Sequence, residues 1–365
     1  MVRVVVVEDS LTVREFLVHI LSSDPEIEIV ATAGTGVAAL EAVKRTRPDV
    51  ITMDIHMPTM NGLDATRMIM QTQPTPIVIV SGALDVVETA SVFRAFEAGA
   101  LAVLPKPFGL EHPEYEQSAA DIVQTVKLMS EVKVVRRRSP LLRGEALPAA
   151  LLTAEPPRRG ARTEAQVVAI GASTGGPPVL QRILSGIPKD FPLPVLIVQH
   201  IATGFTQGFV EWLAQSSSLP VESPTHGQRV SPGRAYVAPD GFHMTVGADG
   251  RISLSSDEPE NGLRPSVSRL FRSVAKAYGR RAIGVLLTGM GKDGAVELKL
   301  MKEQGAVTIA QDKDTSVVHG MPGEAIRLGG ATYILSPEKI AATLTSLAAA
   351  AGGQRETEMS VHETL

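Results

Sequence analysis

Three polar residues in the second half of the chain each follow an apolar run, and together they could form a catalytic triad. They are Ser173, His200 and Asp293. The runs that precede them are Val167–Ile170, Pro194–Val198 and Ile283–Leu287. In a parallel α/β sheet, sites form outside the carboxyl ends of the strands, so we expect the three side chains along one edge. A serine nucleophile, a histidine base and an orienting carboxylate carry out hydrolytic acyl transfer.

The serine lies in a glycine-rich segment, Gly171–Gly175, that matches the G-x-S-x-G turn between a strand and a helix. Pro177 and Pro178 suit the first turn of that helix, where a missing N–H costs little. A glycine-rich turn of this kind could also cradle a phosphate or a dinucleotide. Neither the dinucleotide pattern nor the P-loop pattern is met, and the turn alone leaves both interpretations open.

The histidine and the aspartate both have competitors elsewhere in the chain. The other loop histidines are His226, His243 and His319, and the other candidate carboxylates are Asp240 and Asp312. None of these histidines follows so clear a strand end as His200. The order Ser–His–Asp differs from the Ser–Asp–His order of α/β-hydrolases. This order argues against the α/β-hydrolase fold and indicates that a different fold carries the same three catalytic groups.

A second group of polar residues follows strand-like runs in the first half of the chain. Its members are Glu8, Asp9, Asp54, Ser81 and Lys106. Carboxylates that lie close together repel one another, and a divalent cation relieves that repulsion. Oxygen ligands favour Mg²⁺. An aspartate beside bound Mg²⁺ can accept a phosphoryl group, whose oxygens a hydroxyl and an ammonium group can then neutralise.

The elements that would position these residues alternate between strands and helices. The strand-like runs of the first part are Val4–Val7, Glu28–Ala31, Val50–Met53, Ile77–Val80 and Ala102–Leu104. The alternation resumes at residue 166. We therefore predict an α/β protein with two doubly wound parallel-sheet domains, a flavodoxin-like domain over 1–127 and a Rossmann-like domain over 166–348.

The segment between the predicted domains, residues 128–165, is rich in arginine and proline and predicts a linker. Its arginines could bind an anionic partner or could simply be solvated. The last segment, residues 349–365, is a polar tail, and we expect Gly352–Leu365 to be disordered.

The bulk properties limit the class of protein. The 365 residues suit two domains, and the formal net charge of −4 gives no overall attraction to nucleic acid. There are no cysteines, which excludes disulfides and thiolate chemistry and fits a reducing compartment. No apolar run approaches the roughly 18 residues of a membrane-spanning helix. We expect a soluble, cytoplasmic protein with no membrane insertion and no nucleic-acid partner.

Residues 1–125 resemble the receiver domain of bacterial response regulators. The matching words are Val-Glu-Asp-Ser, Met-Asp-Ile-His-Met-Pro-Thr-Met-Asn-Gly, Val-Ser-Gly-Ala and Leu-Pro-Lys-Pro. The resemblance implies that a CheA-type histidine kinase phosphorylates Asp54. It also implies that Asp9, Asp54 and the backbone carbonyl of His56 hold Mg²⁺. The sequence departs from the pattern at Val103, where an aromatic switch residue is expected.

Residues 166–347 resemble the chemotaxis protein-glutamate methylesterases, the CheB family. The matching words include Ile-Gly-Ala-Ser-Thr-Gly-Gly-Pro, Gln-His-Ile, Arg-Pro-Ser-Val and Leu-Leu-Thr-Gly-Met-Gly-Lys-Asp-Gly-Ala. The resemblance implies Ser173 as nucleophile, His200 as general base and acid, and Asp293 as orienting carboxylate. Thr174 and the backbone at Met290 would complete the site, with no metal or other cofactor.

The implied substrate is a methylated glutamate on a cytoplasmic helix of a methyl-accepting chemotaxis receptor, with deamidation of receptor glutamines as a second activity. The unphosphorylated receiver is expected to block this reaction. Three alternatives remain at this point. They are a response regulator that acts on DNA, a binding module that has lost catalysis, and a nucleotide-binding domain built on the Gly171 turn.

Overall fold

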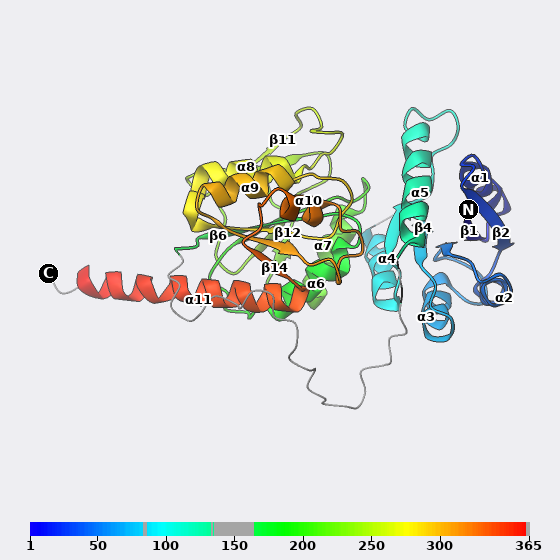
Figure 1. Cartoon of the computed structure of the whole chain (residues 1–365), viewed down its shortest axis with the longest axis horizontal. Coiled ribbons are helices and arrows are strands. Elements are labelled where there is room, and N and C mark those ends of the chain that lie inside the picture. Colours follow the sequence, from blue (N-terminus) through cyan, green and yellow to red (C-terminus); the bar gives the residue numbers. More distant parts are fainter. Residues whose placement is uncertain (83–85, 133, 135–163, 363–365) are drawn as a thin grey trace. The chain divides into compact units, whose positions relative to one another are not determined.

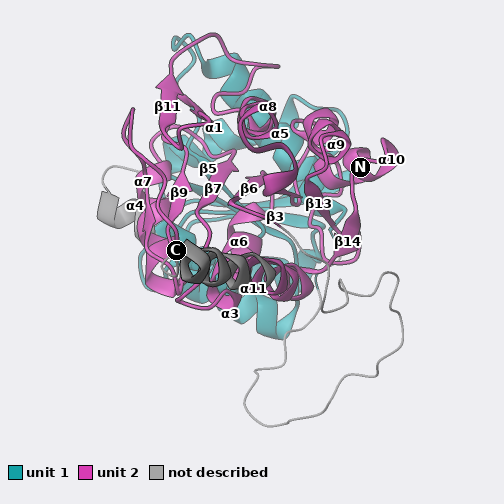
Figure 2. Cartoon of the chain, turned by 90° about the vertical axis from the view of Figure 1, so that its left-hand side faces the viewer, with its two compact units in different colours: residues 1–147 teal, residues 148–365 magenta. Residues whose placement is uncertain are grey.

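In the computed structural model of the protein, the chain divides into two compact units, residues 1–147 and 148–365 (Figures 1 and 2). The structure describes the backbone except at 83–85, 133, 135–163 and 363–365, and it describes no side chains at 86–91 or 350–362. Most of the expected linker, 128–165, therefore lies outside the described residues. Helix α5 runs to Ser130, three residues beyond the predicted end of the first domain.

The first unit contains a five-stranded parallel sheet in the order β2-β1-β3-β4-β5. Its strands are β1 (Val2–Val7), β2 (Ile27–Ala33), β3 (Val50–Met53), β4 (Ile77–Ser81) and β5 (Ala102–Pro105). Its helices are α1 (Leu11–Ser22), α2 (Gly36–Thr46), α3 (Gly62–Thr72), α4 (Val86–Ala98) and α5 (Tyr115–Ser130). All five predicted strands are present, and the doubly wound parallel arrangement predicted for this part is confirmed.

Local sequence explains where three of these helices begin. The side chains of Ser10, Thr35 and Asn61 each accept a hydrogen bond from the backbone N–H three residues later. Such N-caps satisfy a donor that the first helical turn leaves free. Each cap is on a loop that follows a strand, so the helices start beside the carboxyl ends of the strands.

The second unit is built on a seven-stranded sheet in the order β14-β13-β12-β6-β7-β9-β8, with every strand pair parallel. These strands are β6 (Val167–Ala172), β7 (Val195–Gln199), β8 (Val221–Glu222), β9 (Ala235–Val237), β12 (Ala282–Leu286), β13 (Val307–Gln311) and β14 (Tyr333–Leu335). An antiparallel pair, β10 (His243–Val246) and β11 (Ile252–Ser255), lies outside this sheet. The second doubly wound domain is thus confirmed, and its described residues form no helix-turn-helix of the kind that a DNA-binding alternative requires.

Helices cover both faces of the seven-stranded sheet. They are α6 (Gly176–Gly186), α7 (Thr206–Ser216), α8 (Val267–Tyr278), α9 (Ala295–Glu303), α10 (Met321–Arg327) and α11 (Pro337–His362), with a 3₁₀ turn, η1 (Gly279–Arg281). Helices α6 and α11 pack together on one face, and α8 and α9 pack together on the other (Figures 1 and 2). The apolar side of α8, which includes Leu270, Phe271 and Val274, is fully buried.

The carboxyl-terminal helix corrects one expectation. Helix α11 continues to His362, so disorder over 352–362 was a wrong prediction, while 363–365 lie outside the described residues. Alanines 348–351 have the highest helix propensity of any residue type, and no proline follows them. Within the described part of the chain, the search for a helix of membrane-spanning length and apolarity finds none.

In both sheets the strand order reverses at a strand that candidate site residues follow. In the larger sheet, β7 lies on one side of β6 and β12 on the other. In the smaller sheet, β1 lies between β2 and β3. Ligands of open α/β sheets bind in the crevice that such a switch in strand order opens at the carboxyl ends. Each unit therefore has one such crevice available for a site.

Candidate active site

Strand register places the serine and the histidine next to each other. Strands β6 and β7 pair in parallel, with Ala172 opposite Gln199, so the next residues are Ser173 and His200. The His200 N–H donates to the carbonyl of Ala172 at 3.0 Å. Backbones of paired strands lie roughly 4.8 Å apart. The two candidate residues therefore leave neighbouring strands side by side.

Two glycines make room around the serine, one in the serine's own turn and one in the loop that follows β12. Gly175 has φ = 77°, in the left-handed region, and a Cβ there would lie 2.5 Å from Val317. A Cβ on Gly289 would lie 2.7 Å from the Cβ of Ser173. The Ser173 N–H donates to the carbonyl of Thr288 at 3.0 Å. The loop after β12 therefore packs directly against the serine.

Asp293 holds the histidine and also binds the start of a helix. Its Oδ2 accepts hydrogen bonds from His200 Nε2 at 3.0 Å and from the Val267 N–H at 2.7 Å. Its Oδ1 accepts from the Ser266 hydroxyl and the Ser268 N–H, both at 3.0 Å. These last three donors belong to the first turn of α8, whose N-terminus favours negative charge.

This environment keeps the Asp293 carboxylate ionised. Burial alone would raise its pKa, but the His200 hydrogen bond and charge, together with donors from α8, lower the pKa from 3.8 to about 2. The carboxylate is only 5 % exposed. The site therefore contains a fixed negative charge beside the imidazole. Among the described residues, Ser173 Oγ itself makes no hydrogen bond, so strand register, and not a bond between the two side chains, places the serine beside the histidine.

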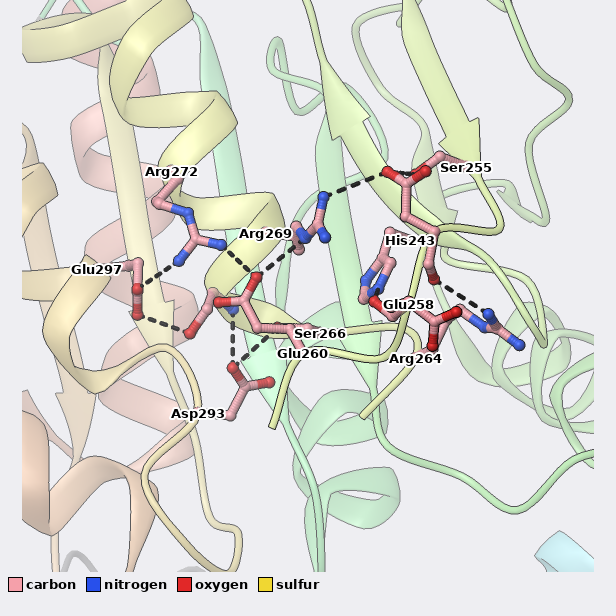
Figure 3. Close-up of polar contacts among 12 residues, drawn as sticks. His243, Ser255, Glu258, Glu260, Arg264, Ser266, Arg269, Arg272, Asp293 and Glu297 are labelled. Carbon is pink, nitrogen blue, oxygen red and sulfur yellow. Dashed lines mark hydrogen bonds and ion pairs between the residues drawn. The ribbon is translucent and has the colours of Figure 1, made fainter. Parts of the chain in front are cut away.

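A polar network holds the first turn of α8 in place (Figure 3). The Ser268 hydroxyl accepts from the Gly294 N–H at 3.0 Å and donates to Glu297 of α9 at 2.7 Å. Arg272 donates to Glu297 at 2.8 Å and also pairs with Glu260 of the preceding loop. The network thus connects α8, α9 and that loop around the turn that binds the Asp293 carboxylate.

Several backbone N–H groups in the loops beside the serine have no acceptor within the described residues. Within the described residues, the N–H groups of Thr174 and Met290 donate no hydrogen bond. The intervening Gly289 N–H is not available, because it donates to the Val318 carbonyl at 3.0 Å. The Thr288 hydroxyl bonds the Thr174 carbonyl at 2.9 Å, which ties the two segments together. The sequence had singled out the Thr174 and Met290 positions.

The competing residues have other partners. Asp240 accepts from the Gly204 N–H and the Thr206 hydroxyl, and Asp312 accepts from Thr315. The three other histidines contact the Leu254 backbone, the Glu258 carbonyl and the Ser316 hydroxyl: they are His226, His243 and His319, respectively. Of these candidates, only His200 and Asp293 follow the two strands, β7 and β12, that flank the serine's strand β6.

The first unit brings its acidic residues together as the sequence predicts. Glu8, Asp9 and Asp54 offer carboxylate oxygens that lie within 4.8 Å of one another. Lys106 Nζ lies 2.9 Å from Glu8 Oε2 and 3.3 Å from Asp54 Oδ2. The buried Ser81 hydroxyl has no hydrogen-bond partner among the described residues. An acceptor carboxylate, a lysine and a free hydroxyl are therefore all present at one edge.

The charges of this cluster fit a divalent cation. Burial raises the pKa of Glu8, and the negative charge of Asp54 raises it further against the opposing effect of Lys106. Burial would lower the pKa of Lys106, but hydrogen bonds and charges from Glu8 and Asp54 outweigh it and raise that pKa. Three carboxylates face one ammonium group, and an all-oxygen donor set suits Mg²⁺. The His56 carbonyl accepts no hydrogen bond within the described residues and could serve as a further ligand.

Comparison with known proteins agrees with this division. The response regulator receiver domain model matches residues 4–113, and the CheB methylesterase model matches residues 168–344. A protein-glutamate methylesterase/protein-glutamine glutaminase of Nitrosospira multiformis is 58% identical over 352 residues, which are 96% of this chain and 98% of that protein. The chain belongs to the CheB methylesterase family. A relative of the same name from Geobacter metallireducens is 58% identical over 349 residues, covering 95% of this chain and 99% of its own length.

Among solved structures, the CheB methylesterase catalytic domain of Thermotoga maritima is 40% identical to this CheB-family chain. It covers 50% of this chain and 98% of its own length, with a TM-score of 0.49. The receiver domain of Thermotoga maritima CheB is 34% identical and covers 36% of this chain and 98% of its own length, with a TM-score of 0.33.

Sequence reasoning about this CheB-family chain missed the residues that support the triad. Ser266 and Ser268 hold the Asp293 carboxylate, and Gln199 contacts the backbone of both Ser173 and His200. A signal for Ser266 was available, because a serine directly before an amphipathic helix is a typical N-cap. No pattern connects Gln199 with the site except its place at the end of a buried strand.

Proposed function

We propose that this protein is a hydrolase that demethylates glutamate methyl esters on the cytoplasmic helices of methyl-accepting chemotaxis receptors and deamidates receptor glutamines. The observation that carries the proposal is the His200–Asp293 pair beside Ser173 at adjacent strand ends. The names of the most similar relatives support the choice of substrate. A substrate on the cytoplasmic part of a receptor agrees with a cytoplasmic location of the enzyme.

The proposed base is Nδ1 of His200. Asp293 accepts a hydrogen bond at Nε2, which fixes the proton there and leaves the lone pair on Nδ1. Nδ1 takes the proton of Ser173 as its Oγ attacks the ester carbonyl, and the imidazolium formed is stabilised by the ionised Asp293. No metal takes part in this step.

The remaining steps follow from the same groups. The N–H groups of Thr174 and Met290 stabilise the oxyanion, at about 3–4 kcal/mol for each donor in related chemistry. The tetrahedral intermediate collapses, and the ester oxygen leaves as methanol with the proton from His200. Water then attacks the glutamyl-serine ester and regenerates Ser173 with a free glutamate. With a glutamine substrate, ammonia leaves in place of methanol.

Regulation is assigned to the first unit. A CheA-type histidine kinase would transfer a phosphoryl group to Asp54, with Ser81 and Lys106 positioned to neutralise its oxygens. Mg²⁺ would be held by Asp9, Asp54 and the His56 carbonyl, and when bound it supplies charge neutralisation for the transfer. The unphosphorylated receiver restrains the catalytic unit, so a fragment of residues 164–365 should release methanol faster than the unphosphorylated full chain.

The test is methanol release from methylated receptor membranes, with and without a small-molecule phosphoryl donor. Ser173→Ala should lower the rate at least about 10³-fold, since its hydroxyl forms the covalent intermediate. Ser185→Ala is the matched control, because this serine is exposed on α6 and bonds only the Arg182 carbonyl. Equal rates for wild type and Ser173→Ala would contradict the proposal.

A further inference from the structure

The last residue of β7, Gln199, joins the backbones of the nucleophile and the base. Its side chain is buried, with 4 % of the residue exposed. The amide nitrogen Nε2 donates to the Ser173 carbonyl at 2.9 Å and to the His200 carbonyl at 2.9 Å. An amide nitrogen carries two hydrogens, so one side chain uses its full donor capacity on two triad residues.

The second half of the same amide is left without a partner. Gln199 Oε1 is buried and accepts no hydrogen bond among the described residues. A Cβ on Gly176 would lie 2.1 Å from this oxygen, so the glycine at the start of α6 makes the space for it. A buried acceptor without a donor is costly and calls for an explanation. The site therefore accepts a penalty in order to aim the amide nitrogen at two carbonyls.

A second buried glutamine shows the contrast. Gln311 ends strand β13 in the same sheet, and its Oε1 accepts from the Thr288 N–H at 2.8 Å. Its Nε2 donates to the Thr315 carbonyl at 2.9 Å. Both halves of that amide are satisfied, as is usual for a buried glutamine. The orphaned oxygen of Gln199 is thus not a general property of strand ends in this sheet.

We propose that Gln199 is a positioning residue for the Ser173–His200 pair, an inference that rests on the proposed function. No other group donates to the His200 carbonyl among the described residues, whereas the Ser173 carbonyl also accepts from the Gly176 N–H at 2.8 Å. Without the amide, the His200 carbonyl loses its donor, and the backbone bond from the His200 N–H to the Ala172 carbonyl remains to join the two strand ends. Since Ser173 and His200 have no direct hydrogen bond, the Gln199 amide is their shared polar contact.

The first experiment uses Gln199→Met, which keeps the length and approximate volume of the side chain and removes both donors. We expect kcat for methanol release to fall about 10- to 100-fold with KM within about twofold, because displacement of reacting groups by an ångström costs rate of this order. The rate at which a small fluorophosphonate labels Ser173 should fall by a similar factor. That labelling does not need the receptor, so it reports on the serine and histidine themselves.

The matched control is Thr308→Val. Thr308 lies near the start of β13, the strand that ends at Gln311. The Thr308 hydroxyl is buried and donates to the Gly330 carbonyl at 2.7 Å, so its loss also removes a buried hydrogen bond. This variant should lose thermal stability but retain kcat and labelling. If Gln199→Met retained wild-type kcat, or lost no more than Thr308→Val at an equal fall in Tm, the positioning role would be overturned.

Gln199→Glu supplies a pH readout that a purely structural role would not give. A protonated carboxyl group retains one O–H donor between the two carbonyls, and an ionised one has none. The ratio of its kcat to that of wild type should therefore fall as pH rises. A ratio that does not change with pH and stays near one would refute the proposal, also when Gln199→Met fails to fold. Absent wild-type activity, or an active Ser173→Ala, would instead refute the proposed function.

Discussion

Asp54 and Asp293 each follow a parallel strand beside a switch in strand order, but their surroundings differ. Asp293 receives three hydrogen bonds from the first turn of α8 and a fourth from His200. Asp54 receives one from the Ile55 N–H at 2.8 Å and contacts Lys106, while two further carboxylates lie close by. The Asp293 carboxylate is saturated with hydrogen-bond donors, and the Asp54 carboxylate keeps oxygen lone pairs free.

The difference shows how donor count decides what a carboxylate can do. A saturated carboxylate stays ionised and fixed in direction, which suits the orientation of a base. A carboxylate with free lone pairs among like charges attracts a cation and can act as a nucleophile. The same position on the same kind of sheet is therefore suited to two tasks, and the following predictions test this comparison.

The largest effect is expected for Asp293→Asn. The amide cannot accept the Nε2 proton and the α8 donors as the carboxylate does, so His200 loses its tautomer and orientation. We expect kcat to fall about 10⁴-fold. The rejected competitors, as Asp240→Asn and Asp312→Asn, are the controls and should each cost less than about tenfold. A larger loss in either of them would reassign the third triad role.

Removal of divalent cations should separate the two sites. With EDTA, we expect complete loss of stimulation by the phosphoryl donor, because the acidic cluster then cannot bind the donor phosphate. Unstimulated methanol release should not change, since the triad uses only protein groups. Asp54→Asn in the presence of Mg²⁺ should give the same two results. A fall in the unstimulated rate with EDTA would show that the catalytic site needs a metal.

Acid should remove a part of the stability that Asp293 provides. Its folded pKa of about 2 lies below the ordinary 3.8, so the stabilisation is present above pH 3.8 and is lost as pH falls through about 2. The shift corresponds to about 2 kcal/mol. Calorimetric unfolding of wild type and Asp293→Asn should show a Tm difference that shrinks over this interval. A constant difference would mean that His200 and the α8 donors do not depress this pKa.

The smallest effect is expected in the network behind α8. Arg272 is 40 % exposed in its side chain and pairs with Glu260 and Glu297. Arg272→Ala should cost about 0.5–1 kcal/mol of stability, in the range of partly exposed pairs, with kcat reduced less than about threefold. The pair of Arg280 with Glu164 is more exposed, so Arg280→Ala should change neither quantity. A large loss of kcat in Arg272→Ala would extend the catalytic support to this network.

The fold was largely predictable because its strands are short, apolar and regularly spaced. Runs such as Val4–Val7 and Ile77–Val80 are buried on both faces, and parallel sheets produce such runs. The end of α11 was not predictable from polarity, because the high helix propensity of the alanines at 348–351 favours continuation of the helix. The antiparallel pair β10–β11 was also missed.

The positions of the three proposed triad residues at neighbouring strand ends were predictable, but the residues that contact them were not. Ser173, His200 and Asp293 each follow an apolar run, and strand direction brings such positions to one edge. The partners of Asp293 come from a helix start about 25 residues earlier in the chain, which spacing alone does not connect with it. Such contacts depend on how α8 packs on the sheet, and that is a tertiary property.

The position of β12 between β6 and β13 has a consequence for synthesis. Ser173 and His200 leave the ribosome well before Asp293, and the strand that joins the two sides of the sheet is made after β6 to β11. A growing chain therefore carries a serine and a histidine that have no orienting carboxylate. On the proposed mechanism, hydrolysis begins only after the late central strand has inserted, so a chain that ends before Asp293 should be inactive.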